Sequence, residues 1–396
     1  MQSLPEVHLI AGTRPEAIKL APVVTAMRAA GRVTPVLVAS GQHPTMVAQA
    51  LAAFDLEPDV VLPVERVTGS QPELMTAMVS TLDALFADRP PAAVIVQGDT
   101  TTTLAGALAA FWRQIPVVHL EAGLRSGDLD SPFPEEGNRR LVGQLAALHL
   151  APTPLAATNL LDEGVPPNKV VLTGNTVVDA ALTVVDGRPE LDPALREVVE
   201  SDARLVLVTA HRRESWGEPL DRVLSAVRTL LNHYPDIHVV LPSHPNPAVR
   251  AQVEAGLAGT PRVTITDPLP YPALARLLSE AYLVLTDSGG IQEEAPSFGV
   301  PALVLREVTE RVESLQAGCA KLVGTDEDLI VAEAARLLDD PVLRRAMTAS
   351  GNPYGDGLAA QRTEMAVAAL LGLGALPEPM PAVIPTQRAA DAALTR

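Results

Sequence analysis

The sequence predicts an α/β protein built from two doubly wound, Rossmann-like halves. Short apolar runs rich in β-branched residues alternate with stretches of helical periodicity, which is typical of parallel strands covered on both faces by helices. This alternation starts at residue 7 and begins again after about residue 175. A chain of 396 residues has room for two or three domains of ~150 residues, so each half is long enough to bury its own core.

The first half contains four expected strands, each followed by a short loop and most by a helical stretch. An apolar-periodic stretch over 17–30 indicates the first helix. Pro15 lies in the first turn of this helix, where a missing N–H costs nothing. Another helix begins after Gly98-Asp99-Thr100 and ends near Trp112. The four expected strands are 7–11, 34–39, 92–96 and 117–120.

The same pattern returns in the second half. It indicates an N-terminal domain over residues 1–174 and a C-terminal domain over 175–358, followed by a helix over about 359–371. Residues 375–396 are rich in proline and are expected to form a disordered tail. The expected strands of this half are 205–209, 237–241, 283–286 and 302–305.

Charge and composition exclude several classes of function. The 30 Lys and Arg residues against 47 Asp and Glu give a net charge of −17, whereas nucleic acids and anionic membranes need a basic partner surface. The single cysteine, Cys319, excludes an internal disulfide and a cysteine-based zinc site. No apolar run reaches the roughly 18–20 residues that cross a bilayer, and no signal peptide is evident, so a soluble cytoplasmic protein is expected.

Motifs for common cofactors and metals are missing from the sequence. Gly12 alone follows the first strand in place of GxGxxG, and no GxxxxGK[ST] sequence occurs. Neither HExxH nor CxxC spacing is present. We therefore expect neither a cofactor nor a metal.

Polar side chains follow most of the expected strands, at the carboxyl ends where doubly wound folds bind ligands. Two such domains would place a ligand in the cleft between them. Ser288-Gly289-Gly290 lies between a strand and a helix, where free backbone N–H groups favour a phosphate, although an ordinary turn is the alternative. Glu294, about one turn into that helix, could accept hydrogen bonds from ribose hydroxyls.

Cations and carboxylates gather at comparable positions. A lone arginine is more often a solvated surface charge, but several at strand ends of an acidic protein favour a diphosphate ligand. Several acids near one crevice suit proton transfer at a sugar carbon, although Asp99 alone could cap a helix and Glu135 alone could complement a helix dipole. The candidates are Arg14, Lys19, Arg212 and Arg311 among the cations, Asp99, Glu121 and Glu135 among the acids, and His211 and His244.

These residues lie in stretches that run in order over about residues 7–370. The stretches are GTRPEAIK (12–19), GDTTTTLA (98–105), HLEAGLRSGD (119–128), SPFPEEGNR (131–139), TGNTVVDA (173–180), AHRRESWG (210–217), TDSGGIQEEAPSFG (286–299), TERVE (309–313) and NPYGDG (352–357). In them the sequence resembles the non-hydrolysing UDP-N-acetylglucosamine 2-epimerases. The resemblance implies a fold like that of GT-B glycosyltransferases, with a final helix that crosses back to the first domain.

The resemblance also implies a reaction, the reversible interconversion of UDP-GlcNAc and UDP-ManNAc. UDP is eliminated to give bound 2-acetamidoglucal and is then added back, without a redox cofactor. Asp99, Glu121 and Glu135 match the acid/base carboxylates, His211 an essential histidine beside the departing UDP, and Lys19 a lysine near the reacting sugar or phosphate. The positions that match UDP-binding residues are Arg14, Arg212, His244, Ser288, Gly289, Gly290, Glu294 and Arg311.

A second, regulatory UDP-GlcNAc site is a further implication. Gln42, His43, Glu136 and Arg212 match its positions, but Pro44 and Thr45 replace polar residues of many bacterial members. We therefore expect weakened or altered activation by substrate. The family also suggests a homodimer and a role in cell-surface polysaccharide synthesis.

Three alternatives remain open. A hydrolysing epimerase would release free ManNAc and UDP, although GTRPEAIK has the non-hydrolysing form. A GT-B glycosyltransferase would need an acceptor for turnover. A catalytically silent UDP-sugar sensor would exchange no deuterium into C2, and the presence of Asp99, Glu121, Glu135 and His211 argues against it.

Overall fold

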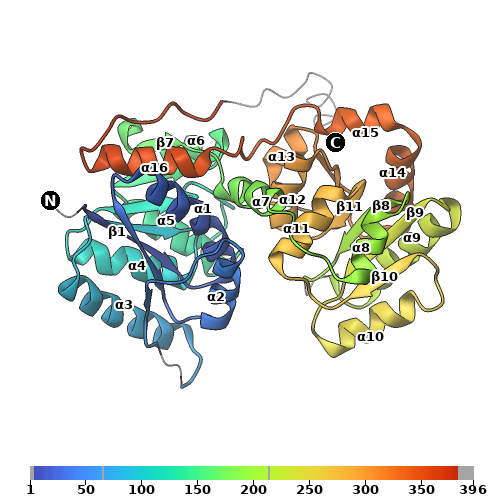
Figure 1. The fold of residues 1–396 in the computed structure, drawn as a ribbon, viewed down its shortest axis with the longest axis horizontal. Helices are drawn as coiled ribbons and strands as arrows, with labels where there is room; N and C mark the ends of the chain where they lie inside the picture. Colours follow the sequence, from blue (N-terminus) through green and yellow to red (C-terminus); the bar gives the residue numbers. More distant parts are fainter. Residues whose placement is uncertain (1–3, 65–66, 213–214, 382–396) are drawn as a thin grey trace. The chain divides into compact units, whose positions relative to one another are not determined.

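The computed structural model describes residues 4–64, 67–212 and 215–381, which form two compact units. Unit 1 contains residues 4–183 and 354–381 of this set, and unit 2 contains residues 184–353. Within these residues the chain passes from one unit to the other twice (Figure 1).

Unit 1 is built on a seven-stranded parallel sheet with the order β3-β2-β1-β4-β5-β6-β7. Its strands are β1 (Glu6–Ala11), β2 (Thr34–Ala39), β3 (Val60–Val61), β4 (Ala93–Gln97), β5 (Val117–Leu120), β6 (Leu148–Ala151) and β7 (Val170–Leu172). Its helices are α1 (Arg14–Ala30), α2 (Pro44–Ala52), α3 (Gln71–Asp88), α4 (Thr101–Trp112), α5 (Glu135–Leu145), α6 (Pro154–Asp162) and α16 (Ala359–Leu370), with most of α7 (Thr176–Asp186) and the short 3-10 helix Pro167–Lys169.

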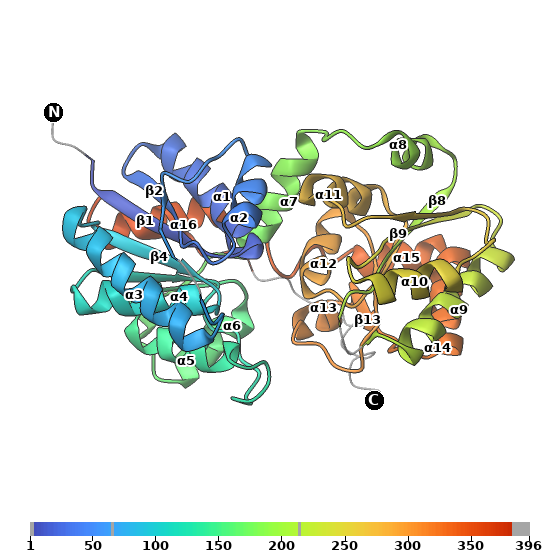
Figure 2. The same ribbon diagram turned by 90° about the horizontal axis from the view of Figure 1, so that it is seen from below.

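The core of unit 1 lies between this sheet and its helices. α3 and α4 pack side by side (Figure 2). Met78, Leu82 and Phe86 recur along one face of α3 and bury against alternate residues of β4, Val94 and Val96. The 3- and 4-residue spacing on the helix and the 2-residue spacing on the strand bring the two apolar faces together.

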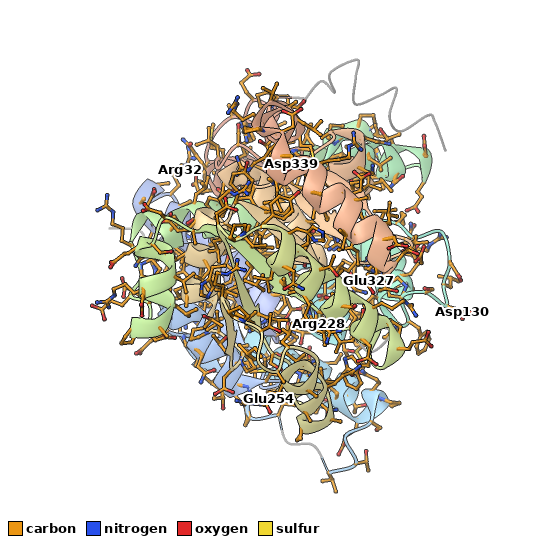
Figure 3. All side chains as sticks on the ribbon, turned by 90° about the vertical axis from the view of Figure 1, so that its right-hand side faces the viewer. Arg32, Asp130, Arg228, Glu254, Glu327 and Asp339 are labelled. Carbon is orange, nitrogen blue, oxygen red and sulfur yellow. The ribbon has the colours of Figure 1, made fainter. Side chains whose placement is uncertain are left out.

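Helix α16 is far from α1 in the sequence but packs beside it (Figure 1). Glu364 of α16 is buried and pairs with Arg32, which follows α1 and is labelled in Figure 3, with Nε 2.9 Å from Oε1. Breaking the pair would leave a buried carboxylate without its cation, so it fastens the returning chain to unit 1.

Unit 2 has a six-stranded parallel sheet with the order β10-β9-β8-β11-β12-β13. Its strands are β8 (Arg204–Thr209), β9 (Ile237–Pro242), β10 (Val263–Thr266), β11 (Leu283–Thr286), β12 (Ala302–Val304) and β13 (Ala320–Leu322). Its helices are α8 (Pro193–Glu200), α9 (Glu218–His233), α10 (Pro247–Gly256), α11 (Tyr271–Glu280), α12 (Gly289–Glu294), α13 (Val312–Gln316), α14 (Glu327–Asp339) and α15 (Pro341–Thr348), with the 3-10 helix Ala295–Phe298. Glu327 of α14, labelled in Figure 3, accepts a hydrogen bond from the Ser225 hydroxyl of α9 at 2.8 Å.

Both sheets have the order of the dinucleotide-binding fold, in which the winding reverses beside the first strand. The reversal lies between β1 and β4 in unit 1 and between β8 and β11 in unit 2. The predicted fold class, two Rossmann-like α/β domains, is confirmed. Within the described residues no helix is both long and apolar enough to span a membrane.

The boundary between the units differs from the sequence-based one at 174. Residues 175–183 stay with unit 1 because they bond to the returning chain. The Asn175 N–H donates to the Tyr354 carbonyl at 2.7 Å, and the Asp179 carboxylate accepts from the Ala360 N–H, at the start of α16, at 2.8 Å. The chain was expected to return to the first domain after residue 358, but it returns at Tyr354, because Tyr354 is already bonded to Asn175 of unit 1.

The predicted disordered tail falls partly within the described residues. Residues 375–381 lie on unit 1, where Met380 is buried and its N–H donates to the Leu172 carbonyl of β7 at 2.8 Å. Gly174 makes room for it, because a Cβ built there would come within 3.0 Å of the Met380 sulfur. Residues 382–396 lie outside the described part of the chain.

Candidate active site

Glu121 directly follows β5 and is held by side chains from three other segments. The Lys19 Nζ of α1 lies 2.5 Å from its Oε1. The Asn175 Nδ2 donates to the same oxygen at 3.1 Å, and the Gln97 amide donates to Oε2. Both members of the Lys19–Glu121 pair are nearly buried, so each needs the other's charge. The pair, together with the two amide donors, fixes the direction of the Glu121 carboxylate.

The backbone of Glu121 is also unusual. Its φ is +64°, in the left-handed region that residues other than glycine rarely adopt. Such a conformation costs on the order of 1–3 kcal/mol and persists where the surrounding structure imposes it. The preceding strand end and the buried side-chain bonds supply that constraint, and together they aim the carboxylate.

Asp99 lies at the neighbouring strand end, two residues after β4. Arg139 of α5 places Nε 2.8 Å and Nη2 2.7 Å from Asp99 Oδ2, and the Asn138 side chain donates to the Asp99 carbonyl at 2.8 Å. The alternative that Asp99 caps α4 is wrong, because Thr100 is the N-cap residue and accepts from the Thr103 N–H. Asp99 is instead half-buried, with its carboxylate clamped from α5.

Glu135 is the first residue of α5 and is half-buried. Within the described residues its side chain makes no hydrogen bond or ion pair, unlike the side chains of Asp99 and Glu121. Its position at a helix N-terminus also suits the alternative role of complementing the helix dipole.

Asp99 and Glu121 are brought to one edge of the sheet, since β4 and β5 are paired and a Cβ on Gly98 would lie 3.8 Å from Glu121 Oε2. Because α5 also holds Asp99, Glu135 begins a helix bound to that edge.

Glu16 ties the two loops at the switch point of unit 1 together. Its buried carboxylate accepts from the Gly12 and Thr13 N–H groups, both at 2.7 Å, and from the Thr100 hydroxyl at 2.5 Å. Burial raises the pKa of Glu16 above its usual value, against these hydrogen bonds. The loop that leads into α1 is thus fixed to the loop that bears Asp99. Arg14, the first residue of α1, is exposed.

In unit 2, His211 follows β8 and contacts a buried acid. The His211 Nδ1 lies 3.0 Å from Asp287 Oδ1, and the His211 and Arg212 N–H groups each donate to Oδ2 at 2.9 Å. Burial favours a raised pKa for Asp287, but the bonds from His211 and the two N–H groups outweigh it and the pKa is lowered. The imidazole is half-exposed, so its position is set from inside while its other edge stays accessible.

Ser288 is the N-cap residue of α12, and Gly289 and Gly290 begin the helix at the switch point of unit 2. The Arg311 guanidinium lies across this helix start: a Cβ on Gly289 would come 3.1 Å from Arg311 Cζ. Arg311 Nε lies 2.9 Å from Glu293 Oε1, which anchors the guanidinium. An arginine beside the N–H groups of a helix start makes a place that suits an anion.

The remaining predicted residues of unit 2 lie near the same edge of its sheet. Glu294, at the end of α12, is hydrogen-bonded to the Tyr271 phenol. Burial of this phenol, together with the charge and hydrogen bond of Glu294, holds the pKa of Tyr271 well above its usual value. His244 follows β9, and its ring lies 5.2 Å from that of Trp216. Its Nδ1 accepts from the Asn246 N–H at 3.0 Å, which fixes the other ring nitrogen as the one available to a ligand.

The predicted regulatory residues are divided between the two units. Gln42 accepts from the Thr102 hydroxyl at 2.8 Å, and His43 is exposed before α2. Glu136 is completely buried and is held by Arg139 at 3.2 Å and Arg140 at 3.1 Å. Arg212 belongs to unit 2.

Sequence reasoning did not single out four residues that hold the predicted ones: Glu16, Gln97, Arg139 and Asn175. A signal existed for Glu16, because Thr13-x-x-Glu16 has the spacing of a capping box. The others act over long separations, and Asn175 is 54 residues from Glu121. Among the described residues, no three or more His, Cys, Asp or Glu side chains form a group that could hold a metal ion.

A family model for UDP-N-acetylglucosamine 2-epimerase matches residues 25–368. The chain belongs to this family. The UDP-N-acetylglucosamine 2-epimerase of Bacillus subtilis (strain 168) is 44% identical over 358 residues, covering 90% of this chain and 93% of the relative. The resemblance to UDP-N-acetylglucosamine 2-epimerases is therefore confirmed.

Solved structures of this 2-epimerase family agree with the fold. The structure of S. aureus MnaA with UDP is 41% identical, with a TM-score of 0.85 and coverage of 96% of this chain and 100% of that one. The UDP-GlcNAc 2-epimerase of Neisseria meningitidis bound to UDP-GlcNAc is 39% identical, with a TM-score of 0.82 and coverage of 93% and 100%. The two-unit architecture thus extends over nearly the full length of these epimerases.

Proposed function

We propose that this protein interconverts UDP-GlcNAc and UDP-ManNAc by reversible elimination, without net hydrolysis. Family membership supports the substrate, and two related structures hold UDP or UDP-GlcNAc. The observation that carries the chemistry is the buried Lys19–Glu121 pair beside the clamped Asp99. Carboxylates fixed in place at a ligand-binding sheet edge suit proton transfer at carbon.

The proposed reaction has two balanced halves. A carboxylate removes the C2 proton while the C1–O bond breaks, so the C–H electron pair forms the C1=C2 bond of 2-acetamidoglucal and UDP leaves with the C–O pair. A proton then returns to C2 from the other face, and a UDP oxygen bonds to C1 again. We assign the proton transfers to Asp99, Glu121 and Glu135.

The residues of unit 2 suit the leaving group. Ser288, Gly289, Gly290 and Arg311 offer N–H groups and a cation to a diphosphate, and His211 is positioned by Asp287. Electrostatic support of a leaving diphosphate is usually a large term in such a reaction. Arg14, Lys19, Arg212, His244 and Glu294 complete the proposed set of ligand and sugar contacts.

The test is the product formed from UDP-GlcNAc in D2O, followed by NMR. Formation of UDP-ManNAc with deuterium at C2 of both UDP-sugars is expected. Free ManNAc as the main product would indicate the hydrolysing reaction, and turnover only with an added acceptor would indicate a glycosyltransferase. Absence of exchange at C2 would indicate a protein that only binds the sugar nucleotide.

We also propose a regulatory UDP-GlcNAc site formed by Gln42, His43, Glu136 and Arg212. Activation by substrate at this site is expected to be weakened or altered, because Pro44 and Thr45 offer fewer polar groups. Glu136 is buried and shares Arg139 with Asp99, which gives it a route to the proposed catalytic edge. A hyperbolic rate curve for UDP-ManNAc alone, without a lag that UDP-GlcNAc relieves, is expected. A strict requirement for UDP-GlcNAc would contradict this.

The homodimer, the cytoplasmic location and the polysaccharide pathway remain predictions.

A further inference from the structure

Two of the sequence motifs have no part in the proposed chemistry. TGNTVVDA (173–180) precedes the point where the chain leaves unit 1, after Thr183, and NPYGDG (352–357) contains the point where it returns, at Tyr354. Residues 173–180 and 354–357 of these motifs belong to unit 1. Their contacts show what they do there.

The two motifs bind each other and the start of α16. The Asn175 N–H donates to the Tyr354 carbonyl at 2.7 Å. Arg362 of α16 pairs with Asp356 at 2.7 Å and donates to the Thr173 carbonyl at 3.2 Å. The outgoing and returning segments are therefore held together by the main-chain bond and by the buried bond from Arg362 to the Thr173 carbonyl, and the exposed Asp356 orients Arg362.

The side chain of Asn175 links this lock to Glu121. It is buried, its Oδ1 accepts from the Val177 N–H at 3.1 Å, and its Nδ2 donates to Glu121 Oε1 at 3.1 Å. Because a main-chain N–H engages the amide oxygen, the NH2 group must be the one that faces the carboxylate. The charged group on the same oxygen is the Lys19 ammonium, at 2.5 Å.

We infer that Asn175 is a positioning residue for Glu121, and that it sets the direction of this carboxylate from the outgoing segment, to which the returning chain is bonded at Tyr354. The inference rests on the proposed function only for the role of Glu121 in proton transfer. The left-handed backbone of Glu121 leaves its side chain dependent on such outside bonds, because no regular element extends through it. Asn175 neither gains nor loses a proton in the reaction.

Two substitutions test this role. Asn175→Ala removes the donor, and we expect kcat to fall about 10- to 100-fold while KM for UDP-GlcNAc stays within about threefold, since a misdirected catalytic group costs rate more than binding. Asn175→Asp keeps the shape but places a second carboxylate beside Glu121. Two acids sharing one site raise a pKa, so the acid limb of the kcat–pH profile should move up by about one pH unit or more.

The matched control is Asp179→Asn in α7, the helix that begins directly after Asn175. Asp179 bonds the start of α16 but has no bond to Glu121, so this variant should lower Tm and keep the pH profile of the parent. A shift of the profile in Asp179→Asn equal to that in Asn175→Asp would overturn the inference, because a general loosening of the fold would then explain both. An unshifted profile in Asn175→Asp would overturn it as well.

A second measurement does not depend on turnover. The ¹³Cδ resonance of Glu121, assigned by its loss in Glu121→Gln, is titrated by NMR in the parent, Asn175→Ala and Asn175→Asp. A moved titration in Asn175→Asp supports the positioning contact even if the parent forms no UDP-ManNAc, a result that would reject the proposed function alone. An identical titration in all three proteins rejects the positioning role, whether or not the parent is an epimerase.

Discussion

The two units hold their candidate residues in different ways. In unit 1, Glu121 and Asp99 are paired with Lys19 and Arg139, so the carboxylates are neutralised by partners of the same unit. In unit 2, the buried charge is Asp287, the His211 imidazole is half-exposed, and the Arg311 guanidinium lies across the helix start at Gly289. The first arrangement fixes direction, and the second places positive groups beside the N–H donors of a helix start, which suits an anion.

This difference predicts a division between rate and affinity. Groups that act only in the transition state change kcat, whereas groups that bind substrate and transition state alike change KM. Substitutions at the paired carboxylates of unit 1 should therefore lower kcat with little effect on UDP affinity. Substitutions around Asp287 and Gly289 should weaken UDP binding.

Glu121→Gln should have the largest effect. It removes a proposed proton-transfer group and leaves the Lys19 ammonium without its buried partner, so kcat should fall about 10²- to 10⁴-fold. The Kd for UDP, measured by calorimetry, should stay within about threefold of the parent. Near-normal turnover would remove Glu121 from the mechanism, and a large loss of UDP affinity would contradict the division between the units.

Asp287→Asn should follow in size. The amide keeps the shape but removes the charge that the His211 ring and two N–H groups contact, so UDP affinity should fall about 10- to 100-fold. Asp326→Asn is the matched control in the same unit, because it removes an exposed charge at the N-cap of α14 and retains a good capping residue. Equal UDP affinity in both variants would show that Asp287 has no part in binding.

Acid should weaken unit 1 before unit 2. Burial lowers the pKa of His119 and of its cross-strand neighbour His149 to about 4, and the nearby His119 adds to the effect on His149. The unfolded chain takes up these protons near pH 6.5, so the free energy of unfolding falls as the pH drops from about 6.5 to 4, by up to about 3 kcal/mol per residue.

Hydrogen exchange at pH 7 and pH 5, corrected for intrinsic rates, measures this difference. Peptides from β5 and β6 should lose more protection than those from β8 and β11. His149→Gln should reduce the loss, since an amide does not titrate. Equal losses in the two units would contradict the prediction.

Among the described residues, the sequence predicted eight of the strands and missed β3, β6, β7, β10 and β13. The eight expected strands agree with the structure to within one residue at each end, whereas β3, with only Val60 and Val61, and the partly exposed β10 give too weak a pattern. The candidate residues were found because strand ends are visible in the sequence. Their supports were not, since Lys19 and Glu121 are 102 residues apart and Arg139 and Asp99 are 40 apart. Pairing over such distances is decided by tertiary structure.

Gly289→Ala should have a smaller effect than Glu121→Gln or Asp287→Asn, and it tests the anion site most directly. The added methyl would lie 3.1 Å from Arg311 Cζ, so the guanidinium must move by a few tenths of an ångström while Glu293 holds its Nε. UDP affinity should fall about 3- to 10-fold with kcat nearly unchanged. Gly290→Ala is the comparison, because its methyl would meet nothing closer than 3.8 Å, and its effect should be smaller. Calorimetry with UDP measures both variants. If Gly290→Ala weakens binding more than Gly289→Ala, close approach of the ligand to the backbone, and not the placement of Arg311, limits affinity at this helix start.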